Sequence, residues 1–408
     1  MGLETYWGLP EKVIFCKNCC YSNQRPNSTH EFLHKSDGKK TSILFGNDDI
    51  CDACKFNELK VKIDWSERER QLTDLLDQHR KSDGSYDCLV PGSGGKDSVY
   101  AAHVLKYKYG MNPLTVTWPP FSYTKYGYAN FKNWIDVGGL DNMSYNPNGR
   151  ILNLLTKLSV ENLFHPFQTF ILGQKLVAPK FAAKFGIPLV FYGEHEAEYG
   201  NPIAETETSL QSDSFHAIEN YDDISIAGLS IQQLEEDYQV TLADLAPYLP
   251  LPASEYRKKK IAVHYLGYYL KWQPQASYYY AVKHGGFEAR PFRTEGTFSK
   301  YSGIDDKIDD LNYYTYFIKF GIGRCTEDVS QEIRNGHIDR DEGCALVDRY
   351  DGEFPETYFL EMMRKLDIDP EYFRYELTDK FRSPHLWAKD NGEWKLRHNV
   401  NLTGYNDN

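Results

Sequence analysis

The part of this chain best suited to chemistry is a short run rich in glycine and charged side chains. It lies between an apolar, strand-like stretch at residues 87–90 and a helical pattern over residues 99–109. A glycine loop at such a junction lets backbone N–H groups approach phosphate oxygens, with the helix N-terminus behind them. The run also supplies hydroxyl donors, a cation and a carboxylate for Mg²⁺; its residues are Gly92, Ser93, Gly94, Gly95, Lys96, Asp97 and Ser98. It therefore predicts a phosphate-binding site.

Two better-known phosphate loops do not fit this run. A Walker A loop needs glycine where Val90 stands, and Ser or Thr directly after Lys96, where Asp97 stands. The dinucleotide pattern G-x-G-x-x-G begins at Gly92 but meets Asp97 at its third glycine. What remains, Ser-Gly-Gly-x-Asp-Ser, resembles the PP-loop of the N-type ATP pyrophosphatases. This resemblance implies that ATP is cleaved between its α and β phosphates and that a substrate oxygen is adenylated. The alternative is an ordinary glycine-rich turn between a strand and a helix.

The cysteines suggest a second site. Five of the eight lie in the first 54 residues, as Cys16-x-x-Cys19-Cys20 and Cys51-x-x-Cys54. Two such knuckles fit one tetrahedral Zn²⁺, with Cys16, Cys19, Cys51 and Cys54 as its ligands and Cys20 as an alternative to Cys19. Disulfide bonds are the competing interpretation, which the absence of a secretory signal disfavours. A closed four-cysteine site leaves no open position on the metal, so this zinc should be structural. We expect the chain between the knuckles to form a small hairpin excursion.

Length, charge and hydropathy limit the class of protein. A chain of 408 residues exceeds the usual size of a single core, so we expect two domains or one enlarged domain. The net charge of −12 is concentrated at residues 201–250, which hold ten acidic side chains and no Lys or Arg. We interpret this segment as a solvated insertion, with an acidic docking surface as the alternative. Such a field repels phosphate backbones and disfavours a nucleic-acid substrate.

The chain shows no signal for a membrane or for secretion. No apolar run of about 18 residues is present, so we expect no transmembrane helix. The N-terminus lacks a basic region followed by an apolar one. We therefore expect a cytoplasmic protein.

The loop needs a sheet to position it, and the flanking patterns predict one. Helical signals at residues 64–81 and 150–185 alternate with strand signals at residues 112–118 and 187–192. The first helix should be capped by Asp64 or Ser66. With the strand before the loop, this order predicts an α/β fold with a doubly wound parallel sheet. Ligands in such sheets bind beyond the carboxyl ends of the strands.

Polar residues follow one of these predicted strands. Residues 187–192 lead directly into Gly193-Glu194-His195-Glu196. Two carboxylates and an imidazole at a strand end could meet Mg²⁺ or an incoming nucleophile. The alternative is a polar surface loop.

We expect three regions along the chain. They are an N-terminal Cys₄ zinc module at residues 1–63, an ATP-binding core at 64–250 with its acidic insertion, and a mostly helical substrate or partner region at 251–408. Within the last region, helical patterns occur at residues 254–271, 329–349 and 355–366. Between them, residues 286–324 mix charges of both signs with glycine and tyrosine, a composition typical of a polyanion or sugar site.

Three features together resemble the N-acetyl sugar amidotransferase family, whose members include WbpG and PseA. They are the paired cysteine knuckles, the Ser-Gly-Gly-Lys-Asp-Ser loop, and a late block that runs from residues 294–297 to residues 318–321. The resemblance extends over about residues 15–355. It implies a fold of the PP-loop, HUP-like type, and conversion of a sugar acetamido group into an acetamidino group in bacterial lipopolysaccharide O-antigen or other surface-glycan biosynthesis.

The resemblance also implies roles for single residues. ATP would bind at the loop, with Mg²⁺ held partly by Asp97, and Thr117 would lie near the adenine. The amide oxygen would attack the α-phosphorus, and ammonia would then displace AMP from the adenylated imidate. Stabilisation of the leaving pyrophosphate by cations and N–H groups would be the main contribution of the protein. Lys96 supplies one such cation, and Lys319 and Arg324 are candidates for a second phosphate clamp.

The chain has no visible glutaminase of its own. A nucleophilic cysteine would follow Met1, where Gly2 stands, or occupy an elbow, which Gly343-Cys344-Ala345-Leu346 does not complete. Ammonia should therefore be free or come from a separate glutaminase subunit similar to HisH, with or without a HisF-like barrel subunit. We expect a groove or tunnel ending near Glu194, which could deprotonate or orient the ammonia.

Two other functions remain open at this point. Some PP-loop enzymes thiolate or otherwise modify RNA, and Cys325 and Cys344 are the candidate reactive thiols. A non-catalytic ATP-binding scaffold is the other alternative. Within the favoured function, both a UDP-linked diacetamido uronic acid and a nine-carbon nonulosonic acid fit as the sugar.

Overall fold

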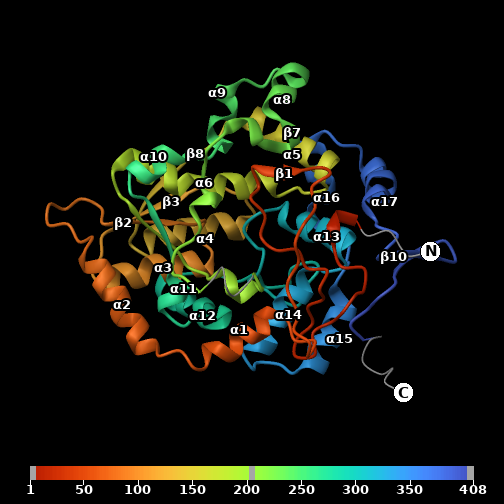
Figure 1. The fold of residues 1–408 in the computed structure, drawn as a ribbon, viewed down its shortest axis with the longest axis horizontal. Helices are drawn as coiled ribbons and strands as arrows, with labels where there is room; N and C mark the ends of the chain where they lie inside the picture. Colours follow the sequence, from red (N-terminus) through yellow and green to blue (C-terminus); the bar gives the residue numbers. More distant parts are fainter. Residues whose placement is uncertain (1–5, 202–206, 402–408) are drawn as a thin grey trace.

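The core of the protein is a five-stranded sheet in which every pairing is parallel. The computed structural model describes residues 6–201 and 207–401. The strands lie in the order β4-β3-β2-β5-β9. Their bounds are β2 (Cys88–Pro91), β3 (Pro113–Thr117), β4 (Asp141–Ser144), β5 (Leu189–Tyr192) and β9 (Ala262–Tyr265). The order reverses direction between β2 and β5, so the sheet is doubly wound and the predicted fold class is confirmed. The whole fold is drawn in Figure 1.

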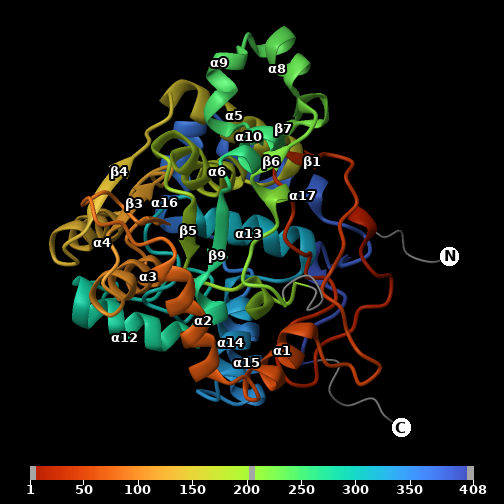
Figure 2. The ribbon, with the colours of Figure 1, turned by 60° about the vertical axis from the view of Figure 1, so that its left-hand side comes forward.

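Helices cover both faces of this sheet, and the strands alternate accordingly. Cys88 and Val90 of β2 join a core with α2, α3, α4, α11 and α12, whereas Leu89 joins a core with α5, α6 and α10. On the first face lie α2 (Trp65–Asp77), α3 (Lys96–Tyr107), α4 (Lys125–Asp136), α11 (Leu266–Tyr269) and α12 (Pro274–Gly285). On the second lie α5 (Gly149–Leu163), α6 (Gln168–Phe185) and α10 (Ala253–Lys258) (Figure 2). The N-cap of α2 is Asp64, whose side chain accepts from two backbone N–H groups.

The N-terminal segment crosses the molecule beside the sheet. It contains η1 (Tyr6–Gly8), β1 (Leu33–Lys35) and α1 (Asp52–Lys60). The chain leaves the knuckle region and returns at an antiparallel bridge between Pro26 and Ser42. At the far end of this excursion, β1 pairs in parallel with β7 (Ser225–Ser230) of the acidic segment. The excursion is therefore anchored far from the cysteines. It is not the small local hairpin that we expected between the knuckles.

The acidic segment forms a cap at the top of Figure 1. Its short elements are η3 (Asp213–Phe215), β6 (Ala217–Ile218), η4 (Tyr221–Asp223), β7, α8 (Ile231–Tyr238), α9 (Leu242–Leu245) and η5 (Ala246–Tyr248). Helix η2 (Glu196–Tyr199) precedes the segment, and β8 (Leu251–Pro252) follows it. Several of its apolar residues, among them Ile226 and Leu234, are buried in the core that includes α5 and α6. The acidic side chains from Glu207 to Asp237 are exposed, as expected of a solvated segment; Glu205 lies outside the described residues.

The C-terminal region is mostly helical, as predicted. It comprises α13 (Asp309–Phe320), α14 (Arg324–Arg334), α15 (Arg340–Tyr350), α16 (Glu356–Leu366), η6 (Tyr372–Leu377), α17 (Thr378–Phe381), β10 (Trp387–Asp390) and β11 (Glu393–Leu396). The single helix expected at residues 329–349 is instead two. Gly336 has a φ of 74° between them, and Asp339 starts α15 with a capping box.

The prediction of one helix over residues 254–271 is also wrong. Helix α10 ends at Lys258, and the apolar run that follows becomes β9, which pairs with β5. Burial beside an existing strand outweighs the helical pattern of these residues, because a short apolar run fits either structure. The sheet therefore extends past residue 250, where we expected the core to end; the boundaries at residues 63 and 250 remain predictions as limits of domains.

No helix within residues 6–201 and 207–401 is both long and apolar enough to cross a membrane.

Close packing of α6 against the chain after β3 gives a test of the fold. A Cβ on Gly173 of α6 would overlap the indole ring of Trp118. We expect Gly173→Ala to lower the free energy of unfolding by about 1–3 kcal/mol, because overpacking outweighs the gain in helix propensity. Denaturant unfolding measures the change. Gly149→Ala is the matched control, since a Cβ there meets no atom within 4 Å and should not destabilise. Equal effects of the two substitutions would contradict this packing.

Candidate functional site

The predicted phosphate loop joins β2 to α3 at the point where the strand order reverses. Gly94 has a φ of 87°, and a Cβ there would lie 2.7 Å from the carbonyl oxygen of Asn130 in α4. Only glycine allows this left-handed turn and this close approach. Gly95 is the N-cap of α3 and makes no side-chain cap, so the first N–H groups of the helix lack that partner. Backbone donors at a helix N-terminus are suited to an anion.

The loop after β5 packs directly against the loop after β2. A Cβ on Gly193 would lie 2.8 Å from the carbonyl oxygen of Asp97. This contact sets the Glu194 carboxyl beside that of Asp97. The hydroxyl of Tyr199 donates to Glu194. The two neighbouring strand ends thus bring two carboxyl groups together. The sequence placed Asp97 and Glu194 each at the end of a strand, but it did not predict that the two would meet.

The two carboxyl groups differ in protonation. The Asp97 Oδ2 accepts from Lys96 Nζ at 2.5 Å, and Oδ1 accepts from Trp272 Nε1 at 2.8 Å. Burial opposes ionisation of Asp97, but the charge of Lys96 and the hydrogen bonds from Glu194, Lys96 and Trp272 together outweigh it and keep the pKa of Asp97 below its usual value. Burial, together with the charge of Asp97, raises the pKa of Glu194 to about 8. Near neutral pH the pair therefore shares one proton. Two adjacent carboxyl groups also form a set of oxygen donors that suits Mg²⁺.

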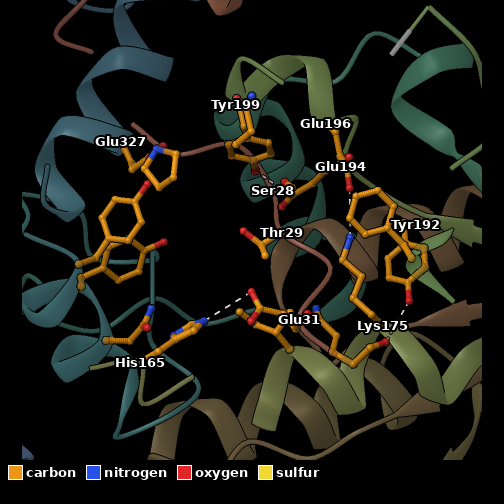
Figure 3. A pocket seen from close by; sticks show the side chains of 18 of the residues that line it. Ser28, Thr29, Glu31, His165, Lys175, Tyr192, Glu194, Glu196, Tyr199 and Glu327 are labelled. Carbon is orange, nitrogen blue, oxygen red and sulfur yellow. Dashed lines mark hydrogen bonds and ion pairs between the residues drawn. The ribbon is translucent and has the colours of Figure 1, made fainter. Parts of the chain in front are cut away.

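Loop, strand ends and helices enclose a cavity of about 650 Å³. The loop side consists of Gly92, Ser93, Gly95, Lys96, Asp97 and Ser98. Facing it are side chains of α13 and α14, including Tyr313, Lys319, Arg324, Glu327 and Asp328. Figure 3 shows Glu194 and Tyr199 on one side of the cavity and Glu31 and His165 on the other. The site therefore combines residues that lie more than 200 positions apart in the sequence.

Most of the predicted site residues meet in this cavity, although several already have partners. Lys319 Nζ donates to the carbonyl oxygen of Leu163 at 3.0 Å. Arg324 lies 3.3 Å from Asp309 and stacks over Tyr313. Gly94 shapes the loop without lining the cavity.

Thr117 is not brought to the cavity. It is fully buried, and its hydroxyl accepts from Asn142 Nδ2 at 2.9 Å. The side chain is thus used to join β3 to β4.

The first part of the late block supports the cavity from outside and does not line it. Gly296 N–H donates to Glu353, and the Thr297 hydroxyl donates to Asp328, so this turn braces α14 and the chain after α15. Asp305 accepts from the Ser93 hydroxyl at 2.8 Å and so links the block to the loop. Residues 294–297 support the site without lining it.

Sequence reasoning missed the wall formed by the N-terminal excursion. The cavity is lined by residues 25–29 of the excursion and by Glu31, Phe32, His34 and Lys40. Sequence reasoning also missed Lys175 of α6, which pairs with Glu196 at 3.2 Å. The excursion carries no periodic pattern, and its position depends on the pairing of β1 with β7, about 190 residues away. No local signal could have revealed it.

The four predicted cysteine ligands form one buried cluster. The Sγ atoms of Cys16, Cys19, Cys51 and Cys54 all lie within 4.8 Å of one another. The group could hold a metal ion in the tetrahedral arrangement typical of four thiolates. Cys20 is directed elsewhere, with its Sγ 3.9 Å from that of Cys344. The structure therefore favours Cys19 over Cys20 as the fourth ligand.

The two cysteines considered for thiolation lie away from the cavity. Cys325 is fully buried, and burial raises the pKa of its thiol above the ordinary value. Cys344 packs against Cys20. None of the described residues that line the cavity is a cysteine. The arrangement thus offers no thiol for a sulfur-transfer reaction at the loop.

Comparison with known proteins finds a family similarity in the C-terminal part. Residues 295–401 match the family model described as LPS biosynthesis protein WbpG-like, C-terminal domain. A curated relative, an uncharacterised protein of Methanocaldococcus jannaschii, is 36% identical over 84 residues. That match covers 21% of this chain and 30% of the relative, so the chain spans less than a third of the relative's length.

Solved structures give weaker likenesses. An NH₃-dependent NAD synthetase from Campylobacter jejuni is 15% identical, with 48% of this chain and 93% of that chain covered and a TM-score of 0.25. The U34-tRNA thiolase NcsA from Methanococcus maripaludis is 12% identical, with 84% and 89% covered and a TM-score of 0.26.

The cysteine cluster predicts a bound metal ion. We expect elemental analysis of the purified chain to find one equivalent of metal, and Cys51→Ser to lose most of it. Because a closed thiolate site couples metal binding to folding, the substitution should also lower the free energy of unfolding by several kcal/mol, roughly. Cys344→Ser removes a nearby thiol outside the cluster and is the control. Equal metal content in all three proteins would show that the cluster binds none.

Proposed function

We propose that this chain is the synthetase component of an ATP-dependent amidotransferase that forms an amidine. Its substrate would be a nucleotide-activated or acidic N-acetyl sugar, whose acetamido group becomes an acetamidino group. ATP would be cleaved to AMP and pyrophosphate, and the nitrogen would come from ammonia. The setting would be the synthesis of a bacterial lipopolysaccharide O-antigen or related surface glycan.

One observation carries this proposal. A Ser-Gly-Gly-x-Asp-Ser loop faces, across one cavity, residues of the segment that matches the WbpG-like C-terminal domain. The loop supports AMP-forming activation, and the matching segment supports an acceptor from lipopolysaccharide synthesis. Both sets of residues border the same 650 Å³ space, so nucleotide and acceptor could react there directly.

The chemistry of an amide explains why such a loop is needed. Resonance makes an amide carbon a poor electrophile, and adenylation of its oxygen creates a good leaving group. The N–H groups at the start of α3 would hold the phosphates, and Lys96 would neutralise charge on the departing pyrophosphate. Asp97 would hold Mg²⁺ in part, and the ion when bound would add further positive charge at the phosphates. Lys96 and Trp272 fix the orientation of Asp97 for this task.

The attacking nitrogen must reach the same point. Glu194 lines the cavity beside Asp97 and is held by Tyr199. Its carboxyl group could orient ammonia or take a proton from it as AMP leaves. The sequence contains no recognisable glutaminase elbow, which supports supply by a separate glutaminase subunit.

The cysteine cluster would stabilise the same site without lining it. Cys19 and Cys51 bracket the excursion whose residues line the cavity. A zinc ion bound by the four thiolates would close the base of this excursion and limit its movement. Zinc would therefore act structurally, by fixing one wall of the binding site.

Product analysis tests the proposal. The purified chain is incubated with ATP, Mg²⁺, ammonium chloride and either a UDP-linked diacetamido uronic acid or a diacetamido nonulosonic acid. We expect AMP and pyrophosphate in equal amounts, and a sugar product that has exchanged one oxygen for NH, seen by mass spectrometry. Release of ADP, or AMP without a changed sugar, would contradict the proposed reaction.

A matched pair of variants assigns the activity to the loop. Lys96→Ala should lower kcat/KM by about 10²–10³-fold, the usual effect of removing one group that stabilises developing charge. The matched control is Lys108→Ala. Lys108 lies at the other end of α3, where its side chain is half exposed, so this variant should behave as the wild type. Similar losses in both variants would mean that the loop is not the site of reaction.

A further inference from the structure

We infer that the cavity holds a second anion-binding site, on the side away from the phosphate loop, built from Lys40, Lys319 and the His34–Glu31–His165 cluster. This inference rests on the proposed function and names the substrate group that the site would take. That group is an oxyanion of the acceptor sugar, either the diphosphate of a nucleotide sugar or the carboxylate of a sugar acid.

The first argument is a comparison of the cations in the cavity. Among the residues that the structure describes, six Lys and Arg side chains line it. Four of them have a carboxylate within 3.3 Å, in the pairs Lys96–Asp97, Lys175–Glu196, Arg324–Asp309 and Arg25–Glu327. Lys40 and Lys319 form no ion pair with any part of the chain that the structure describes. They are therefore the two cations left for a ligand.

The nearest carboxylate cannot neutralise both lysines. Glu31 Oε2 lies 3.2 Å from His34 Nδ1, and Oε1 lies 3.5 Å from His165 Nε2. Both oxygens thus face imidazole rings, as Figure 3 shows for His165. Lys319 instead donates to the Leu163 carbonyl, and Lys40 donates to the Thr29 hydroxyl at 3.3 Å. Each lysine retains N–H groups that can reach an anion.

Burial makes these charges costly without a ligand. Lys319 is only 5% exposed. Burial, with the like charge of Lys40 nearby, lowers the pKa of Lys319 to about 7. Burial also lowers the pKa of Lys40, against the opposing charge of Glu31. An oxyanion between the two ammonium groups would compensate both charges in a setting of low dielectric constant.

The same geometry disfavours a metal ion. Two histidines and one carboxylate within 4.8 Å could coordinate a divalent cation. Lys40 and Lys319 act on these histidines electrostatically, and each disfavours added positive charge there. Repulsion between a dication and nearby ammonium groups opposes its binding. An anion is attracted by the same two ammonium groups, which outnumber the single ionised carboxylate of Glu31.

The position of this site fits an acceptor that spans the cavity. Glu31 and His165 lie opposite Glu194 in Figure 3, with Ser28 and Thr29 between them. An acceptor anchored at its anionic group by the lysines could extend past these hydroxyl groups toward the loop. Its acetamido group would then meet the α-phosphate of ATP. The second site would thus select acidic sugars and orient them.

Equilibrium binding tests this inference without any need for turnover. The full chain, saturated with α,β-methylene-ATP so that the loop is occupied, is titrated calorimetrically with UDP-N-acetylglucosamine and with glucuronic acid. The first probe carries a diphosphate and the second a carboxylate. The variants are Lys319→Met and Lys40→Met, which keep an unbranched side chain and remove the charge; Lys96→Met is the matched control in the loop.

We expect the wild type to bind at least one probe, and both lysine variants to bind it about tenfold or more weakly, as charge-assisted hydrogen bonds predict. The affected probe shows whether a diphosphate or a carboxylate is the ligand. Both variants should bind the ATP analogue as the wild type does, which also shows that they fold. Lys96→Met should show the reverse pattern.

Three results would overturn the inference. They are wild-type affinity for the probes in both lysine variants, no binding of either probe by the wild type, and a second equivalent of bound metal that His165→Ala removes. Failure of the proposed function looks different. In that case the lysine variants would lose probe binding while the wild type formed no amidine with any sugar, and the anion site would stand.

Discussion

The contact between the loops after β2 and β5 is the constraint on which the rest of this site depends. Gly193 fits against the backbone of Asp97 because it has no side chain, and this places two carboxyl groups next to Lys96 at the reversal of the sheet. Strand order alone brings the two strand ends together, since β2 and β5 are neighbours. Every other wall of the cavity is arranged around this pair of loops.

The other walls come from distant parts of the chain and are held by different means. The N-terminal excursion begins and ends beside the cysteine cluster, and the pairing of β1 with β7 holds its far end. The C-terminal helices are braced by the turn at residues 294–297 and by Asp305, which reaches the loop. The cavity consequently has two groups of cations. Those beside the loop form ion pairs with carboxylates, and the two lysines on the side of Glu31 form no ion pair with a described residue. A substrate with an activatable amide and a separate anionic group matches both.

Local features of this molecule could be predicted from sequence, and features that depend on distant pairing could not. The glycine loop between a strand and a helix, the grouping of four cysteines and the sheet class follow from spacing and pattern over about 30 residues, and the structure contains all three. Strand β9 was mistaken for a helix because its apolar run is short and only its place beside β5 decides its structure. Thr117 was expected near the nucleotide, yet its hydroxyl is used inside the sheet. The wall from Arg25 to His34 has no local signal, because a strand pairing across the whole molecule determines it.

The central claim is that the amide oxygen of the acceptor attacks ATP at the α-phosphorus. Isotope transfer tests it most directly: the acceptor is prepared with ¹⁸O in its acetamido group and converted with ATP and ammonia, and the AMP is examined by mass spectrometry. The account predicts that each AMP formed carries one ¹⁸O atom from the acceptor. Unlabelled AMP, with the heavy oxygen in water or in inorganic phosphate, would contradict it.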